Sequence, residues 1–235
     1  MLCKIADLSI QVPATGEMLS RCKDYLTNEQ VSADIIIRAD LYRPHKYPTF
    51  DEKGVAYMES SIQFSRQLLN FNGLYLHSSA IVYEGRAYLF SGPSGMGKST
   101  HTRLWKQLFG ADAVVINDDK PALRYIDGVW YAYGTPWCGK DGINVNTKAP
   151  LGGICFLKRG EINSIRRLDT FEATTSILSQ TIRRFKDKTT LDLLLQHLEC
   201  LTSKIPVYEL YNIPVPEAAL LSYETMRSGA EEAGL

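Results

Sequence analysis

The sequence predicts an α/β (α+β) protein with a mixed central sheet and a small N-terminal α+β portion. Two observations predict this class. A β-rich run at residues 87–90 leads into a glycine-rich loop, and a helical pattern follows at residues 99–109. Short β-rich runs and longer helical patterns then alternate along the chain, which is typical of a sheet covered by helices. The later strands are expected at residues 113–116, 130–133 and 153–157, and the later helices within residues 171–204 and at 216–226.

Residues 1–55 form the predicted N-terminal portion, and residues 56–235 form the domain that carries the glycine-rich loop. A polar, Pro-bearing stretch between residues 40 and 54 reads as a loop and places the boundary there. The N-terminal portion carries no recognisable chemistry. Its strands are expected at residues 5–12 and 34–38, and its helix at residues 18–26.

Composition excludes several classes of partner. Lys and Arg number 26 and balance 26 Asp and Glu, so no overall charge favours nucleic acid or an anionic membrane. No apolar run approaches the roughly 20 residues that span a bilayer, and the N-terminus lacks a signal-peptide pattern. The 5 cysteines are widely spaced and form no CxxC pair, which indicates reduced thiols. We therefore expect a cytoplasmic protein.

The central signal is the segment Gly92-Pro93-Ser94-Gly95-Met96-Gly97-Lys98-Ser99, which matches G-x-x-x-x-G-K-[ST] between a β-rich run and a helix. Glycines let successive backbone N–H groups face a phosphate, and the helix adds its positive end. A lysine supplies charge to the β- and γ-phosphates, and the serine hydroxyl is a natural Mg²⁺ ligand. The motif predicts binding of a nucleoside triphosphate with Mg²⁺. The residues expected at the phosphates are Gly92, Ser94, Gly95, Met96, Gly97, Lys98, Ser99 and Thr100.

Two further elements flank this loop. Asp118-Asp119 follows the apolar run at residues 113–116, where a phosphate-loop protein is expected to carry its metal-binding acid. One carboxylate can hold Mg²⁺ while the other accepts the proton of an attacking hydroxyl. His77 lies on a β-rich run before the loop. Each has an ordinary alternative, since paired Asp residues often form solvated turns and a strand His is often structural.

From residue 76 to residue 124 the chain resembles the catalytic domain of HPr kinase/phosphorylase, a bacterial serine kinase related to ATP-dependent phosphoenolpyruvate carboxykinase. The resemblance consists of His77, the loop with Ser94-Gly95 inside it, and Asp118-Asp119, in that order. It implies the P-loop fold of that type, with Lys98 on the phosphates. It also implies Ser99 and Asp119 on Mg²⁺, Asp118 as general base and His77 as the hydrogen-bond partner of Asp118.

The chain departs from that family's pattern in two places. Thr100 stands where the family has Glu after the loop serine, and the later Glu-Ile-Arg-Gly run is missing. Residues 134–157 instead look like those of HPr-kinase-like bacterial proteins often encoded beside peptide-modification genes, a likeness that extends through residues 205–208 and the C-terminal helix. The acceptor is therefore left open among a small alcohol, an amino acid and a Ser or Thr of a peptide or protein. The related kinases assemble as oligomers, so a homo-oligomer is compatible with the resemblance.

Two basic residues are candidates for the substrate side. Lys140 lies between Gly139 and Asp141, where a glycine lets an ammonium approach an anion. Arg184, after Arg183 in a helical run, could stabilise transition-state charge as an arginine finger does. The ordinary alternatives are an exposed surface lysine and a solvated helix face.

The sequence favours a kinase that transfers the γ-phosphoryl group of ATP to a hydroxyl. A nucleotide-gated binding or regulatory protein without phosphotransfer is the alternative from another class, because the same loop serves both. A carboxykinase-like lyase is a third, although the chain is short for one and shows no second set of metal ligands. ATP is favoured over GTP because no Asn/Thr-Lys-x-Asp segment occurs in register.

Overall fold

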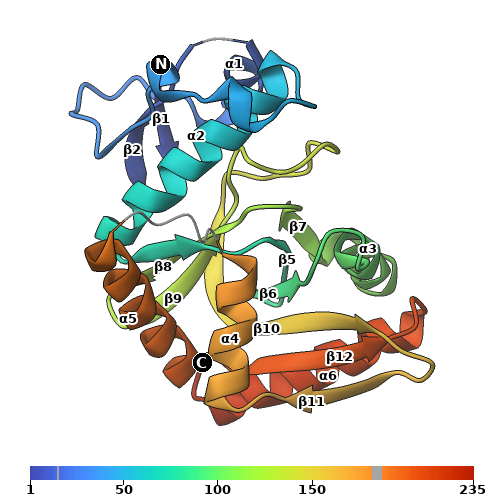
Figure 1. The fold of residues 1–235 in the computed structure, drawn as a ribbon. Helices are drawn as coiled ribbons and strands as arrows, with labels where there is room; N and C mark the ends of the chain where they lie inside the picture. The colour runs from blue at the N-terminus through green and yellow to red at the C-terminus, as the bar shows by residue number, and fades with distance from the viewer. Residues whose placement is uncertain (15, 182–186) are drawn as a thin grey trace.

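A nine-stranded mixed sheet runs through the middle of the molecule, and a three-stranded sheet lies at its N-terminal end (Figure 1). These counts refer to residues 1–14, 16–181 and 187–235, which the computed structural model describes. The large sheet contains β4 (Gly73–Tyr75), β5 (Ser78–Tyr83), β6 (Arg86–Ser91), β7 (Val114–Asn117), β8 (Ala122–Ile126), β9 (Val129–Tyr133), β10 (Lys148–Arg159), β11 (Ser164–Arg167) and β12 (Val207–Asn212).

The long strand β10 joins the two halves of the large sheet. Its first part pairs antiparallel with β9, and its second part pairs parallel with both β6 and β12. The strand order is β4-β8-β9-β10-β6-β5-β7, and β12 adds β11 beyond β10. The mixed α/β class and the mixed sheet predicted from the sequence are therefore confirmed.

Helices cover both faces of the sheet half that contains β6. On this strand Leu89 belongs to one core cluster and Phe90 to another, because successive side chains of a strand point to opposite faces. The Leu89 cluster includes side chains of α4 (Thr170–Gln180) and α5 (Lys188–Lys204). The Phe90 cluster includes side chains of α3 (Lys98–Phe109) and α6 (Pro216–Glu232). The sheet is thus a middle layer that holds the start of α3 in place.

The N-terminal portion shares a core with the large sheet. Its apolar cluster contains Phe64 and Leu68 of helix α2 and also Tyr133 and Trp137. The predicted boundary between residues 55 and 56 falls inside α2, so this helix links the two parts. The division into residues 1–55 and 56–235 stays a prediction. We count α2 with the N-terminal portion, whose elements are then β1 (Leu2–Ile5), β2 (Leu8–Gln11), α1 (Gly16–Arg21), β3 (Ile35–Ile36) and α2 (Glu52–Leu68).

Several predicted elements differ from those observed. The single strand expected at residues 5–12 is a hairpin, because Ala6 and Asp7 adopt φ of 53° and 60° and turn the chain between β1 and β2. The first helix ends at Arg21 instead of residue 26. Strands β8, β11 and β12 were not predicted. Short 3₁₀ helices occur at Lys23–Tyr25, Ala39–Leu41, Pro44–Lys46, Leu69–Phe71 and Gly110–Asp112.

No helix in the described ranges combines the length and the apolar character needed to cross a membrane.

Candidate active site

The glycine-rich loop connects the end of β6 to the start of α3. Gly95 and Gly97 have φ of 78° and 98°, a region that side chains with a Cβ rarely adopt. A Cβ at either position would meet no heavy atom within 4 Å, so the backbone conformation and not the available space favours glycine here. The loop therefore curls, and the first turn of α3 faces the space that the curl encloses.

Lys98 is the first residue of α3, and its side chain folds back over the loop. Its Nζ donates to the carbonyl oxygens of Gly92 at 2.9 Å and Pro93 at 3.2 Å. Burial lowers the pKa of Lys98, and the carboxylates of Asp118 and Asp119 oppose this shift. The side chain thus brings a positive charge to the mouth of the loop.

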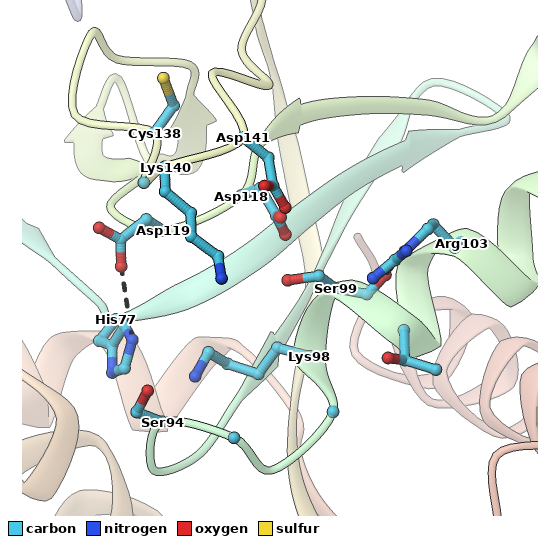
Figure 2. A pocket seen from close by; sticks show the side chains of 14 residues that line it. His77, Ser94, Lys98, Ser99, Arg103, Asp118, Asp119, Cys138, Lys140 and Asp141 are labelled. Atoms are coloured by element: carbon cyan, nitrogen blue, oxygen red, sulfur yellow. Dashed lines mark hydrogen bonds and ion pairs between the residues drawn. The ribbon is translucent and has the colours of Figure 1, made fainter.

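A cleft of about 580 Å³ separates this loop from the residues that follow the C-terminal end of β7 and from residues 138–141 (Figure 2). Gly92 and Met96 do not line it, since Gly92 starts the loop and the Met96 side chain packs against the core between α3 and the sheet. Arg184 lies outside the described residues. The predicted site residues that do line the cleft are His77, Ser94, Gly95, Gly97, Lys98, Ser99, Thr100, Asp118, Asp119 and Lys140.

Asn117 orients the two aspartates at the end of β7. It is fully buried, and its Oδ1 accepts hydrogen bonds from the backbone N–H groups of Asp119 at 2.9 Å and Lys120 at 2.7 Å. Its Nδ2 donates to the carbonyl oxygen and hydroxyl of Thr135. This turn gives the two neighbouring carboxylates different surroundings.

Asp118 points toward the helix side of the cleft. Its Oδ1 is buried and has no hydrogen-bond partner among the described residues. Figure 2 shows the carboxylates of Asp118 and Asp141 and the hydroxyl of Ser99 directed into the same part of the cleft. Oxygen ligands of this kind suit Mg²⁺, which also keeps water and phosphate oxygens in its shell.

The described residues contain no group of three or more His, Cys, Asp or Glu side chains that could hold a metal ion by themselves. A cation at Asp118 would therefore draw its other ligands from Ser99, water and a bound phosphate. The buried Asp118 oxygen without a partner is the observation that fits such an ion.

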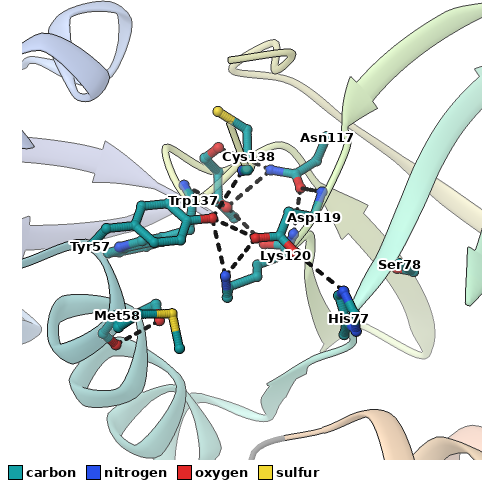
Figure 3. A network of polar contacts seen from close by, with 12 residues as sticks. Tyr57, Met58, His77, Ser78, Asn117, Asp119, Lys120, Trp137 and Cys138 are labelled. Atoms are coloured by element: carbon teal, nitrogen blue, oxygen red, sulfur yellow. Dashed lines mark hydrogen bonds and ion pairs between the residues drawn. The ribbon is translucent and has the colours of Figure 1, made fainter. Parts of the chain in front are cut away.

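Asp119 is held by three neighbouring side chains (Figure 3). Its Oδ2 accepts hydrogen bonds from the Tyr57 hydroxyl and the Lys120 ammonium, and its Oδ1 lies 3.4 Å from Nε2 of His77. Burial alone would raise the pKa of Asp119, but the Lys120 charge and the hydrogen bonds from Lys120 and Tyr57 hold it below its ordinary value. His77 was predicted to partner Asp118; the structure pairs it with Asp119 instead.

The His77 ring lies between Asp119 and Gln180. Its Nδ1 is 3.2 Å from Oε1 of Gln180. Burial and the Lys98 charge lower the pKa of His77, although Asp119 opposes the shift. The lowered pKa favours the neutral ring, whose one N–H donates to one of these two neighbours at a time.

Lys140 extends its ammonium into the cleft from the loop at residues 138–141, on the side opposite Lys98 (Figure 2). Arg103 of α3 also lines the cleft, and its Nε donates to the carbonyl oxygen of Ser99 at 3.1 Å. The cleft thus combines cations, carboxylates and backbone donors, which is the set that a nucleotide polyphosphate requires.

Several site residues, Asp141 among them, were not identified from the sequence. Asn117 and Lys120 flank the aspartate pair, so their position beside it was the available signal. Arg103 lies one helical turn after the loop serine, on the face that looks into the cleft. Tyr57 gives no local signal, because its partner Asp119 is 62 positions away.

Comparisons with known proteins give a distant structural likeness. No protein-family model matches the sequence, and no curated protein matches it. Among solved structures, the chain is similar to the Hpr(Ser) kinase/phosphatase from Coxiella burnetii at 14% sequence identity. The match covers 67% of this chain and 91% of that chain, with a TM-score of 0.40. A likeness at this TM-score carries no functional assignment.

Proposed function

We propose that this chain is a kinase that transfers the γ-phosphoryl group of ATP to a hydroxyl acceptor in the presence of Mg²⁺. One observation carries the proposal. A G-x-x-x-x-G-K-S loop at the start of a helix faces two differently held aspartates across a single cleft. The first feature suits the phosphates, and the second separates a metal-binding carboxylate from a proton acceptor.

The loop at residues 92–99 supplies the phosphate side of the site. Its positive-φ glycines and the first turn of α3 direct backbone N–H groups toward bound phosphates, as in a P-loop. Lys98 exchanges its bonds to the loop carbonyls for bonds to phosphate oxygens, and Lys140 approaches from the opposite side. A hydrogen bond from the ammonium to an anionic phosphate oxygen joins two opposite charges, so it is stronger than the bond to an uncharged carbonyl oxygen that it replaces.

We assign the two aspartates roles opposite to those that the resemblance implied. Asp118 and Ser99 would hold Mg²⁺, because the Asp118 oxygen is buried without a partner and Asp119 is already bonded. The metal would neutralise charge on the β- and γ-phosphates. Asp119 then remains as the carboxylate that receives the acceptor's proton.

These residues can account for each bond and proton that the transfer moves. Asp119 takes the proton of the acceptor O–H, whose oxygen forms a bond to the γ-phosphorus while the bond from that phosphorus to the β–γ bridging oxygen breaks. ADP leaves with its negative charge beside Lys98. A low pKa for Asp119 is compatible with this role, since the loose transition state of phosphoryl transfer calls for little proton abstraction before the bond to the leaving group breaks. His77 stays neutral and steadies Asp119 through Oδ1.

The test is ³¹P NMR of the protein with Mg²⁺-ATP and a panel of small alcohols, amino acids and Ser- or Thr-containing peptides. A phosphoester signal that is lost in Asp119→Asn would support the kinase and name its acceptor class. Asp118→Asn is expected to weaken Mg²⁺ dependence as well as turnover. Saturable ATP binding with no product anywhere in the panel would replace the kinase with a nucleotide-gated binding protein.

A further inference from the structure

The Tyr57 hydroxyl is a junction between the N-terminal portion and the cleft. It donates to Oδ2 of Asp119, accepts the backbone N–H of Gly139 at 2.9 Å and lies 3.1 Å from Nζ of Lys120 (Figure 3). Tyr57 comes from α2. Of its three partners, Asp119 and Lys120 follow the C-terminal end of β7, and Gly139 belongs to the loop at residues 138–141. One hydroxyl therefore ties the carboxylate proposed as base to the loop that covers it.

Arg21 of α1 supports the same point from a second helix. Its Nη1 donates to the carbonyl oxygen of Gly139 at 2.8 Å, and its guanidinium lies 4.7 Å from the centre of the Tyr57 ring. Lys120 Nζ lies 4.3 Å from that ring centre as well. A bond from Arg21 Nε to Glu17 at 2.7 Å fixes the guanidinium in turn. The ring is thus held by two cations, and both backbone polar groups of Gly139 bond to side chains of the N-terminal portion.

We propose that Tyr57 and Arg21 are positioning residues of the phosphotransfer site, so that the N-terminal portion completes the site by orienting Asp119 and the loop at residues 138–141. This inference rests on the proposed kinase function. Phosphoryl transfer depends on in-line placement of the acceptor, and a displacement of about 1 Å can lower a rate about 100-fold. Two donors occupy Oδ2 of Asp119, so Oδ1, which lies 3.4 Å from Nε2 of His77, is the less engaged oxygen that can receive the acceptor's proton.

The decisive variant is Tyr57→Phe, which removes the hydroxyl and keeps the ring. Turnover is measured as consumption of Mg²⁺-ATP, with the acceptor found by ³¹P NMR or with water where none is found. We expect kcat to fall about 10- to 100-fold. The Kd for Mg²⁺-ATP should change less than about threefold, because the loop at residues 92–99 and the Arg21 bond to Gly139 are unaffected. The Gly139 amide should exchange its hydrogen faster, since its acceptor is gone.

Tyr25→Phe is the matched control. Tyr25 is a buried tyrosine of the same apolar cluster, and its hydroxyl has no hydrogen-bond partner among the described residues. This variant should leave kcat, Kd and Gly139 exchange unchanged. Equal kcat values for Tyr57→Phe and Tyr25→Phe would overturn the proposal. A fall in kcat with unchanged Gly139 exchange would confine the role of Tyr57 to Asp119.

A double variant separates this inference from the proposed function. Arg21→Met removes the other bond to Gly139, so Arg21→Met with Tyr57→Phe should accelerate Gly139 exchange by more than the product of the single effects. That measurement needs no turnover. If the wild-type protein consumes no ATP with any acceptor, the kinase proposal fails, while the exchange data still decide whether these residues hold the loop. If the double variant accelerates Gly139 exchange only by the product of the two single effects, Tyr57 and Arg21 do not hold the loop together, and the proposal is contradicted.

Discussion

The glycine-rich loop and the Tyr57 junction bring polar groups to the same cleft by different means. In the loop, the contacts are local: Lys98 reaches carbonyl oxygens only 6 and 5 positions away. At the junction, the Tyr57 hydroxyl meets groups 62, 63 and 82 positions away. A local arrangement is encoded in adjacent residues, whereas a distant one exists only once the sheet and α2 have packed.

The chemistry of the two regions differs in the same way. The loop offers mainly backbone N–H groups, whose direction depends on φ and not on the side chains. The junction uses the side chains of Tyr57 and Arg21, each of which must arrive from its own helix. Substitutions of the loop glycines should therefore affect nucleotide binding, and those at the junction should affect catalysis after binding.

The largest expected effect belongs to Lys98→Met. Removing the ammonium takes charge away from the β- and γ-phosphates, where charge develops as the transferred group leaves. We expect phosphotransfer to fall at least about 100-fold. The measurement is initial-rate ³¹P NMR or a coupled ADP assay. Lys106→Met, an exposed lysine on the same helix, should retain wild-type turnover, and wild-type turnover in Lys98→Met would contradict the loop assignment.

The next effect tests whether backbone conformation carries nucleotide binding. Gly97→Ala places a Cβ at φ of 98° and should weaken Mg²⁺-ATP binding about 10-fold or more, because the N–H groups at the start of α3 lose their direction. The strain itself costs about 1 to 2 kcal/mol of folding stability. Calorimetric titration with Mg²⁺-ATP and urea denaturation measure the two quantities separately.

Gly85→Ala is the matched control for that variant. Gly85 has φ of 76° in the β5–β6 turn, and a Cβ there meets no atom within 4 Å, as at Gly97. A comparable loss of stability with unchanged nucleotide affinity is expected. Weakened binding in Gly85→Ala would mean that nucleotide affinity follows global stability and not the loop.

The contrast between local and distant contacts also explains which parts of the site could be predicted from the sequence. The mixed sheet, the loop and the presence of His77 near the aspartate pair are all expected from the order of motifs along the chain. The identity of the aspartate beside His77 is not, because Asp118 and Asp119 are chemically equal in sequence. The choice depends on the turn that Asn117 forms, and adjacent side chains after a strand point in different directions.

The contacts of the N-terminal portion are even harder to predict from the sequence. Nothing in the sequence around Tyr57 distinguishes it from other aromatic residues on an amphipathic helix. Its contact with Asp119 forms only when α2 packs against Tyr133 and Trp137 in the shared apolar cluster. Likewise the positive φ values of Ala6 and Asp7, which make the β1–β2 hairpin, follow no Asn-Gly or Asp-Gly signal.

A smaller effect is expected for Lys140→Met. The Lys140 side chain is exposed and its ammonium points into the cleft, so solvent screens its contact with phosphate. We expect the Kd for Mg²⁺-ATP to rise about 3- to 10-fold and its salt dependence to decrease. Titrations at two salt concentrations measure both. Lys53→Met, an exposed lysine of α2, should change neither, and equal behaviour of the two variants would make Lys140 an ordinary surface residue.

The smallest effect concerns the attachment of the N-terminal portion away from the site. Oδ2 of Asp7 accepts hydrogen bonds from Lys148 at 2.6 Å and from the Tyr133 hydroxyl at 2.7 Å. Burial would raise the pKa of Asp7, but these two partners hold it below its ordinary value. A carboxyl with a lowered folded-state pKa stabilises the protein above its unfolded-state pKa, and this contribution is lost as pH falls through the folded-state value.

Asp7→Asn should therefore reduce the loss of stability between neutral and acid pH, measured by urea denaturation across that range. Asp7 is 45% exposed, so the difference should stay below about 1 kcal/mol. Asn tolerates the positive φ of this turn, which leaves charge as the main change. Asp127→Asn, at φ of 49° in the β8–β9 turn, is the control and should match the wild type. If Asp7→Asn also matches the wild type, the charge of Asp7 does not contribute to this attachment, and the remaining contacts, among them the hydrogen bond from Arg124 to the carbonyl oxygen of Ala6 at 2.7 Å, hold this end of the N-terminal portion.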